Sequence, residues 1–170
     1  AKSILDNQDK NISRVEKISI HPTNNGKIAV KIGSENFEVT NFLLASSAIE
    51  INSWSRKPYW DKQNRYNDNI FRDTIEIFNQ NGKLVVINHL PMEYYLKGLG
   101  EVSNGDLPEK IKTIAVAARG YATFYMQKEN RKYNTDRYDG SDDPNSFQRY
   151  LGLGYELRSP NVAKMVDATA

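Results

Sequence analysis

Hydrophobic residues occupy every second position in several short segments of the first half of the chain, which is the pattern of half-buried β-strands. The clearest examples are KISI at residues 17–20, KIAVKI at 27–32 and NFEVT at 36–40. The segments TNNGK and GSE between them supply the Asn and Gly residues that tight turns use. This pattern predicts an antiparallel β-meander.

The same two-residue period returns further along the chain. FRDTIEIF and KLVVIN, joined by the turn sequence NQNG, predict a β-hairpin over residues 71–88. AIEINSW at residues 48–54 is a further candidate strand, and we expect a loop in the polar, aromatic-bearing sequence RKPYWDKQNRYNDN that follows it. Residues 1–12 are polar and show no period, so we expect them to form a loosely ordered arm.

After residue 88 the hydrophobic spacing becomes helical. Leu90, either Tyr94 or Tyr95, and Leu96 fit a short helix, and the glycines at positions 98 and 100 are expected to end it. A last helix is expected to begin at Ser159, with Pro160 at its first position, and to run through Val162 and Val166. Strands followed by helices predict one α+β domain, with an N-terminal antiparallel β-meander and hairpin followed by packed helices.

The longest predicted helix lies between these two. Asp106 and Glu109 form a capping-box pattern, and Pro108 stands in the first turn, where its missing N–H costs nothing. The apolar stripe of this helix comprises Ile111, Ile114, Ala115, Ala118, Ala122 and Tyr125. Because small residues dominate its middle, neighbouring elements can approach closely. We therefore expect it to be the central, most buried helix.

Composition narrows the classes of protein. The 170 residues carry a net charge of +2, a smaller basic excess than a dedicated nucleic-acid binder normally has. The absence of cysteine excludes disulfides and thiolate metal sites. No apolar run approaches the roughly 20 residues of a membrane span. The opening sequence AKSILDNQDK is not a signal peptide, so we expect any signal or anchor to lie outside this chain.

Glu101 is the main candidate for chemistry. It follows LKGLG at the break between two predicted helices, where packed elements on both sides can hold it in a cleft. An enclosed carboxylic acid keeps its proton near neutral pH, which general-acid cleavage of a glycosidic bond requires. The alternative is a solvated residue near the start of the next helix, which the helix dipole favours.

Arg119 lies beside the apolar stripe of the long helix, so its guanidinium is expected to point toward packed structure and to need an anion or carbonyl partner. One interpretation is an ion pair with a structural carboxylate; the other is that Arg119 orients Glu101 or binds a sugar oxygen. Near the C-terminal end of that helix and beyond it, tyrosines interleave with basic residues. They suit stacking on carbohydrate or single-stranded nucleic acid, although core packing explains most such aromatics. The tyrosines are Tyr121, Tyr125, Tyr133 and Tyr138.

The sequences LPMEYYLKGLGEV and PEKIKTIAVAARGYA together resemble the signature of the stage II sporulation protein D family. YDGSDDPNSFQRYLG resembles the second signature of that family, and VAKMVDAT the third. The resemblance covers roughly residues 71–170. It implies a catalytic core at residues 69–170, which follows the loosely ordered arm at 1–12 and a β-rich part at 13–68 that the residue pattern predicts.

This resemblance implies a peptidoglycan lytic transglycosylase, which cleaves glycan strands between N-acetylmuramic acid (MurNAc) and N-acetylglucosamine (GlcNAc) and forms 1,6-anhydroMurNAc. Glu101 then occupies the position of the catalytic acid. Arg119, which is also assigned to the catalytic residues, occupies that of the helix arginine of the family. Gln148 and Tyr150 match the second signature and are expected to bind substrate. Tyr121 and Lys112 are also assigned to substrate binding.

The implied mechanism needs one carboxylate and no water, unlike ordinary glycoside hydrolysis. The alternative function is a non-catalytic peptidoglycan-binding or amidase-enhancer module, with other cell-wall hydrolases as partners. We expect no nucleic-acid partner, no membrane span in this chain and a location in the cell envelope.

The chain also departs from the family. Ile114 stands where the family usually has Gln, and Gly120 where it often has Thr. Some members bind zinc through Cys and His around the Asp segment, which here has neither residue, so we predict no metal and no cofactor. The family domain continues beyond its third signature, so we expect the domain to be C-terminally incomplete at Ala170.

Overall fold

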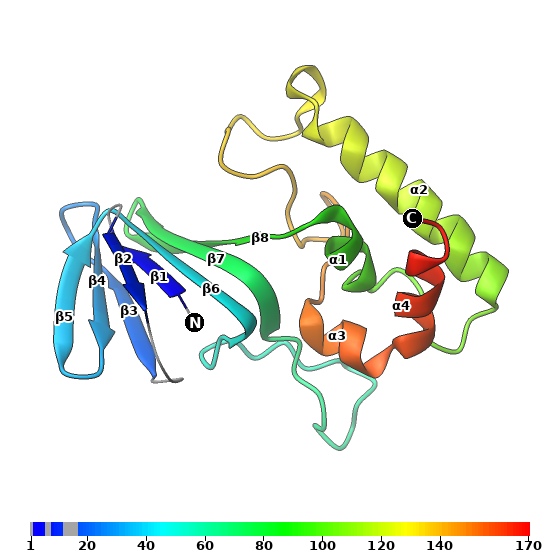
Figure 1. Cartoon of the computed structure of the whole chain (residues 1–170), viewed down its shortest axis with the longest axis horizontal. Helices are drawn as coiled ribbons and strands as arrows, with labels where there is room; N and C mark the ends of the chain where they lie inside the picture. Colours follow the sequence, from blue (N-terminus) through cyan, green and yellow to red (C-terminus); the bar gives the residue numbers. More distant parts are fainter. Residues whose placement is uncertain (1, 6–7, 12–16) are drawn as a thin grey trace. The chain divides into compact units, whose positions relative to one another are not determined.

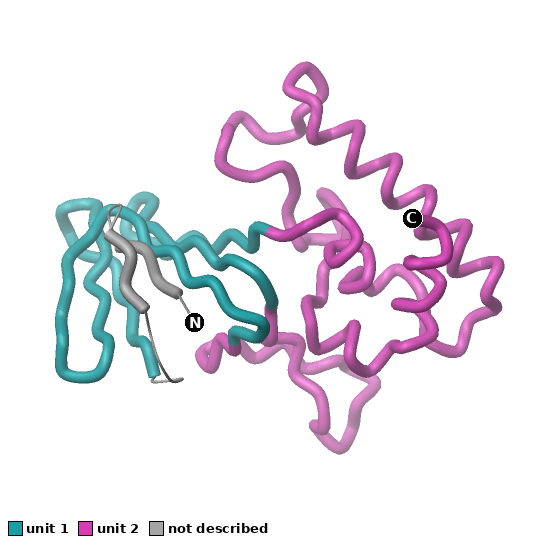
Figure 2. Tube along the Cα trace, viewed as in Figure 1, with its two compact units in different colours: residues 1–49, 72–89 teal, residues 50–71, 90–170 magenta. Residues whose placement is uncertain are grey.

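The structure is a computed structural model of the 170-residue chain and describes residues 2–5, 8–11 and 17–170. Contacts between Cα atoms divide the chain into two compact units, which Figure 2 colours separately. Unit 1 comprises residues 1–49 and 72–89, and unit 2 comprises residues 50–71 and 90–170.

Unit 1 consists of β-strands in two sheets (Figure 1). One sheet has the strand order β2-β1-β6-β7-β8, and the other has the order β3-β4-β5. The strands are β1 (Lys2–Leu5), β2 (Gln8–Asn11), β3 (Ile18–Pro22), β4 (Ile28–Ile32), β5 (Glu35–Val39), β6 (Asn41–Glu50), β7 (Ile70–Gln80) and β8 (Lys83–His89). The first residues of β7 and the last residue of β6 belong to unit 2.

The core of unit 1 lies between its two sheets. Alternate residues of β4 are buried there, together with Phe42 of β6, and Ile77 of β7 packs against the same cluster. β4 thus turns one face to the core, as the two-residue period predicts. The buried members are Ile28, Val30, Ile32, Val39 and Phe42.

The predicted meander and hairpin are confirmed. β3, β4 and β5 pair antiparallel in sequence order, and β7 pairs with β8 with Gln80 opposite Lys83. Asn81 and Gly82 both have positive φ, 54° and 78°, which is the backbone of a two-residue hairpin turn.

Two expectations for the N-terminal half need correction or limitation. The strand expected at residues 48–54 is wrong in its position, because β6 begins at Asn41 and ends at Glu50. Of the arm expected at residues 1–12, the described residues 2–5 and 8–11 form β1 and β2. Residues 1, 6–7 and 12 of that arm lie outside the described residues.

Unit 2 contains the helices, and the colours of Figure 1 show their order along the chain. They are α1 (Met92–Lys97), α2 (Pro108–Met126), the 3-10 turn η1 (Lys128–Asn130), α3 (Leu153–Arg158) and α4 (Pro160–Asp167). α1 and α4 each contact the other three α-helices. The predicted helices at α1, α2 and α4 are confirmed, whereas α3 was not predicted. The α+β class is also confirmed.

The expectation that α2 is the most buried helix is wrong. The predicted stripe is buried at Ile111, Ala115, Ala118 and Ala122, but the opposite face is exposed, including Val116 and Phe124. α2 packs on α1 and α4 through small side chains and leaves its outer side to solvent.

The capping box expected for α2 is also wrong. Leu107 is the N-cap residue, and no side chain caps the helix. The carboxylate of Asp106 instead accepts hydrogen bonds from the backbone N–H of Ser103 and from Lys110 Nζ, both at 2.8 Å. Within the described residues, no helix is long and apolar enough to cross a membrane.

Candidate functional site

The site begins with an antiparallel pairing between the two segments that carry the family signatures. Leu99 pairs with Tyr150 as an isolated β-bridge. On one side of it, Gly100 N–H donates to the carbonyl of Arg149 at 2.8 Å, and on the other Leu151 N–H donates to the carbonyl of Gly98 at 2.8 Å. Residues 98–100 are thereby held against residues 149–151, which lie about 50 positions further along the chain.

Two glycines make this approach possible. A Cβ atom at Gly98 would overlap the ring of Tyr150, and one at Gly100 would overlap the side chain of Leu151. Neither position requires a positive φ, so the requirement is for space rather than for backbone freedom. The glycines therefore do more than end α1, which was their expected role.

Glu101 immediately follows this pairing, and its side chain is exposed. Its Oε1 accepts a hydrogen bond of 2.9 Å from the backbone N–H of Arg149. Glu101 also borders a cavity of about 10 Å³ whose other walls are apolar side chains of α1, α2 and α4 and of the neighbouring residues Leu99 and Val102. That space suits about one water and is too small for a sugar ring. The structure therefore shows the exposed carboxylate, one of the two alternatives that the sequence left open, and not the enclosed one.

Gln148 and Tyr150 lie beside Glu101 on the paired segment, and both are buried. The hydroxyl of Tyr95, on α1, donates to Gln148 Oε1 at 2.9 Å, and its ring stacks on Tyr150 with centroids 5.5 Å apart. Burial, followed by the negative charge of Glu101, raises the pKa of Tyr95. The Tyr95 hydroxyl therefore stays protonated and neutral, and it can donate its hydrogen bond close to the charge of Glu101.

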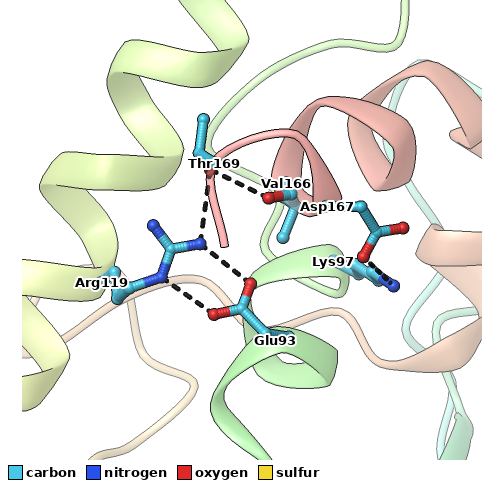
Figure 3. A network of polar contacts seen from close by, with 6 residues as sticks. All are labelled: Glu93, Lys97, Arg119, Val166, Asp167 and Thr169. Carbon is cyan, nitrogen blue, oxygen red and sulfur yellow. Dashed lines mark hydrogen bonds and ion pairs between the residues drawn. The ribbon is translucent and has the colours of Figure 1, made fainter.

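Arg119 contacts a different carboxylate, as Figure 3 shows. Its Nε and Nη2 each donate to Glu93 at 2.9 Å, and Nη2 also donates to Thr169 Oγ1 at 3.3 Å. The hydrogen bond to Glu93 raises the pKa of Arg119. These contacts match the ion pair with a structural carboxylate that the sequence left open. They join α2 to α1 and to the end of the chain.

A second ion pair, also drawn in Figure 3, links α1 to α4. Lys97 Nζ forms an ion pair with Asp167 of α4 at 2.6 Å (Figure 3). α1 carries Tyr95 and is followed directly by the Gly98–Glu101 turn. The two ion pairs therefore fix the helix that positions the site.

Tyr121 takes part in an aromatic cluster around a lysine. Lys132 Nζ donates to the Tyr121 hydroxyl at 2.5 Å and to the carbonyl of Ser146 at 2.9 Å. It also lies 4.7 to 5.8 Å from the ring centroids of Tyr121, Tyr125 and Phe147. The hydrogen bond with Tyr121 raises the pKa of Lys132. Cation–π attraction thus ties the long loop after α2 back to that helix, and Phe147 places this cluster next to Gln148.

Lys112 lies on the surface of α2. Its Nζ pairs with Glu109 Oε1 at 2.9 Å, one turn earlier on the helix. Its assigned role in substrate binding stays a prediction. In the described parts of the chain, no three His, Cys, Asp or Glu side chains are grouped so as to hold a metal ion. The predicted absence of metal likewise stays a prediction.

Sequence reasoning did not identify Glu93, Tyr95 or Arg149. A signal for Glu93 was present, because an arginine on an apolar stripe needs an anion and Glu93 is the only acid in LPMEYYLKG. The backbone N–H of Arg149 carries no signal in the sequence, since any residue supplies one.

A family model described as SpoIID, stage II sporulation protein, matches residues 80–170, which is more than half of the chain. No curated protein matches the chain, and no solved structure does. The matched region begins at the end of β7 and contains the four α-helices, Glu101 and the paired segment 149–151.

Proposed function

The chain belongs to the stage II sporulation protein D (SpoIID) family, and we propose that it is a peptidoglycan lytic transglycosylase of the cell envelope with Glu101 as general acid and base. The family is linked to lytic activity on the cell wall. The observation that carries the proposal is the Arg149 N–H bond to Glu101, which orients the carboxylate beside the buried Gln148 and Tyr150.

In the proposed reaction, Glu101 donates its proton to the oxygen between MurNAc and GlcNAc as the bond from that oxygen to C1 breaks. The resulting carboxylate accepts the proton of the 6-hydroxyl group of the same MurNAc. The 6-oxygen then bonds to C1 and closes the 1,6-anhydro ring. One carboxylate thus serves both steps, and no water is consumed.

The exposure of Glu101 bears directly on this mechanism. A strand lying over Glu101 would exclude water from it, and loss of water favours the neutral acid. Tyr95 is placed to support such a site, since its neutral hydroxyl orients the side-chain amide of Gln148. We assign Gln148, Tyr150, Tyr121 and Lys112 to substrate binding. We assign Arg119 to positioning, because it holds α1 through Glu93.

The test is conversion of purified glycan strands to anhydro-muropeptides, followed by mass spectrometry. We expect Glu101→Gln to lower the rate at least about 100-fold, since general acid–base catalysis contributes about 10²- to 10⁴-fold. Glu129→Gln is the matched control, because Glu129 is an exposed glutamate of η1. Product formation at the wild-type rate by Glu101→Gln would remove Glu101 as the acid.

The same exposure favours a second candidate function, a non-catalytic peptidoglycan-binding or amidase-enhancer module. This module would bind strands, yield no anhydro product and stimulate a cell-wall amidase added in the same assay. Wild-type protein that binds strands without cleaving them, while the amidase is stimulated, would favour this candidate over the enzyme.

A further inference from the structure

Residues 54–67, here called the aromatic loop, connect β6 to β7 and lie outside the region that the family model matches. Tyr59 is 83% exposed and Trp60 is 52% exposed. Large aromatic side chains are mostly buried in folded proteins, so two consecutive exposed rings are informative. The loop belongs to unit 2, as does Glu101.

The aromatic loop is internally braced around Asp61, which is only 5% exposed. The Asp61 Oδ2 accepts a hydrogen bond of 2.8 Å from the backbone N–H of Tyr66, and Asp61 N–H donates to the carbonyl of Pro58 at 3.0 Å. Burial opposes the charge of Asp61, but hydrogen bonds from Tyr66 and Arg65 outweigh it and lower its pKa. Asp61 thus stays ionised and accepts hydrogen bonds that hold residues 61 and 66 of the loop together.

The two ends of the loop are clamped by one amide side chain. Asn67 Oδ1 accepts from the backbone N–H of Arg56 at 2.7 Å, and Asn67 Nδ2 donates to the carbonyl of Trp54 at 2.9 Å. Trp60 rests against Tyr66, with ring centroids 5.7 Å apart. The rings are therefore presented on a preformed frame, which lowers the entropy that binding would cost.

The loop is attached to the segment that orients Glu101. Arg56 Nη2 donates to the carbonyl of Tyr150 at 3.1 Å and pairs with Asp142 at 2.9 Å. Tyr150 is the bridge partner of Leu99, and its neighbour Arg149 donates to Glu101. One short stretch of chain therefore supports both the candidate acid and the aromatic loop.

The side chains of the loop indicate the kind of ligand. Residues 55–66 read SRKPYWDKQNRY, with four basic residues, one acidic residue and no aliphatic residue. Insertion into a membrane surface normally adds Leu or Phe to the Trp and Lys residues, so this composition does not favour a lipid partner. Aromatic faces beside amides and ammonium groups instead suit a sugar chain that carries carboxylates, as muramic acid residues without a stem peptide do.

We propose that the aromatic loop is a second binding site for the peptidoglycan glycan strand, with Tyr59 and Trp60 stacking on sugar rings and Lys57 and Lys62 contacting muramic carboxylates. This inference rests on the proposed function for the identity of the polymer. It assigns to the loop a role in holding the strand, separate from bond cleavage at Glu101.

The test measures the dissociation constant for purified glycan strands with the full chain and with Tyr59→Ala/Trp60→Ala. Loss of both rings is expected to weaken binding about tenfold, which corresponds to about 1.4 kcal/mol for the two stacking contacts together. Phe124→Ala is the matched control, since Phe124 is a ring 50% exposed on the outer face of α2. It should leave the constant unchanged. An unchanged constant for the double variant would overturn the proposal.

A second pair of variants tests the carboxylate contact. Wild-type protein is expected to bind glycan strands more tightly than neutral GlcNAc oligomers of equal length, and Lys57→Ala/Lys62→Ala should remove that preference. If this variant still preferred glycan strands to GlcNAc oligomers as strongly as the wild type does, the role of the lysines would be overturned. Loop-dependent binding to phosphatidylglycerol vesicles or to a thymidine oligonucleotide, without binding to strands, would overturn the glycan as ligand.

The outcomes separate this inference from the proposed function. If the wild type forms anhydro product and Tyr59→Ala/Trp60→Ala binds strands as tightly as the wild type, the enzymatic function stands and the loop is not a binding site. If the wild type forms no anhydro product but its binding to strands depends on the two rings, the enzymatic function is rejected and the loop remains a binding site. Thermal unfolding of each variant checks that the fold is intact.

Discussion

Gly98 and Gly100 show how a missing side chain shapes the site. They allow the carbonyl and N–H groups on either side of Leu99 to pair with residues 149–151, and so bring Glu101 to the N–H of Arg149. At the residue scale, the contact that orients the candidate acid thus depends on backbone approach as much as on the acid itself.

Gly98→Ala is expected to destabilise the fold by about 1–3 kcal/mol, the usual cost of forcing a methyl group into a packed site. The added Cβ would meet the ring of Tyr150, which is itself buried and stacked on Tyr95. Chemical denaturation followed by Trp fluorescence measures the change.

Gly105→Ala provides the matched control, since a Cβ at Gly105 would meet only the Ser103 hydroxyl at 3.9 Å. We expect its free energy of unfolding to lie within about 0.5 kcal/mol of the wild-type value. Equal losses in the two variants would show that the space at Gly98 is not what holds the pairing.

Individual site residues were predictable to different degrees. Glu101, Gln148 and Tyr150 were identified because they lie in long ordered motifs, and the structure brings all three together. Arg119 was identified as unusual from its position on an apolar stripe, but its partner was left open, since a stripe shows that an anion is needed without showing which one. The exposure of Glu101 was one of two alternatives that the sequence left open, because burial depends on elements far apart in the sequence.

At the scale of elements, the contact between Arg119 and Glu93 is the main polar link between α2 and α1. Both side chains are partly exposed, at 22% and 34%, so solvent screens the pair to some extent. Its geometry is nevertheless bidentate, which is the strong form of such a contact. This link fixes the helix that carries Tyr95.

A double-mutant cycle with Arg119→Ala and Glu93→Ala is expected to give a coupling energy of about 1 kcal/mol. The pair Lys112 and Glu109 serves as control, because it lies on one helix and its acid is 82% exposed. Its coupling energy should be about 0.3 kcal/mol. Comparable values for the two pairs would contradict a special role for Arg119 in holding α1.

Secondary structure was predictable where the period was long and the turns were distinctive. Alternating hydrophobic residues and an Asn-Gly turn predict the β7–β8 hairpin, and the apolar stripe predicts α2. β6 was misplaced because its sequence NFLLASSAIE mixes small and apolar residues with little alternation. α3 was missed because it follows Gly152 and has no side-chain N-cap signal, whereas α1, which is equally short, was marked by the glycines after it.

At the scale of the whole molecule, aromatic residues are divided unequally between the two units. All ten tyrosines and both tryptophans fall within residues 50–71 and 90–170, and unit 1 has none of either. Tryptophan fluorescence therefore reports on unit 2 alone, whereas the far-UV signal of β-strands comes mainly from unit 1. The two units can be followed separately in one sample.

Alkaline pH is expected to destabilise unit 2 before unit 1. Burial raises the pKa of both Tyr95 and Tyr155 above the ordinary value of 10.0, and the charge of Glu101 raises that of Tyr95 further. A group whose folded pKa is raised gives stability that is complete below its unfolded pKa and is lost as the pH rises above it. The free energy of unfolding of unit 2 should therefore hold up to about pH 10 and fall beyond it.

Denaturant unfolding between pH 8 and pH 11, monitored by tryptophan fluorescence and by far-UV circular dichroism, measures this difference. Tyr95→Phe loses the hydrogen bond to Gln148 and should cost about 1–2 kcal/mol at pH 8. Its stability should nevertheless fall less steeply above pH 10, because one buried phenol no longer has to ionise. Tyr59→Phe, at a tyrosine that is 83% exposed, should leave the slope unchanged. Loss of the strand signal at a lower pH than the fluorescence signal would show that unit 1, which has no tyrosine, is instead the alkali-sensitive part.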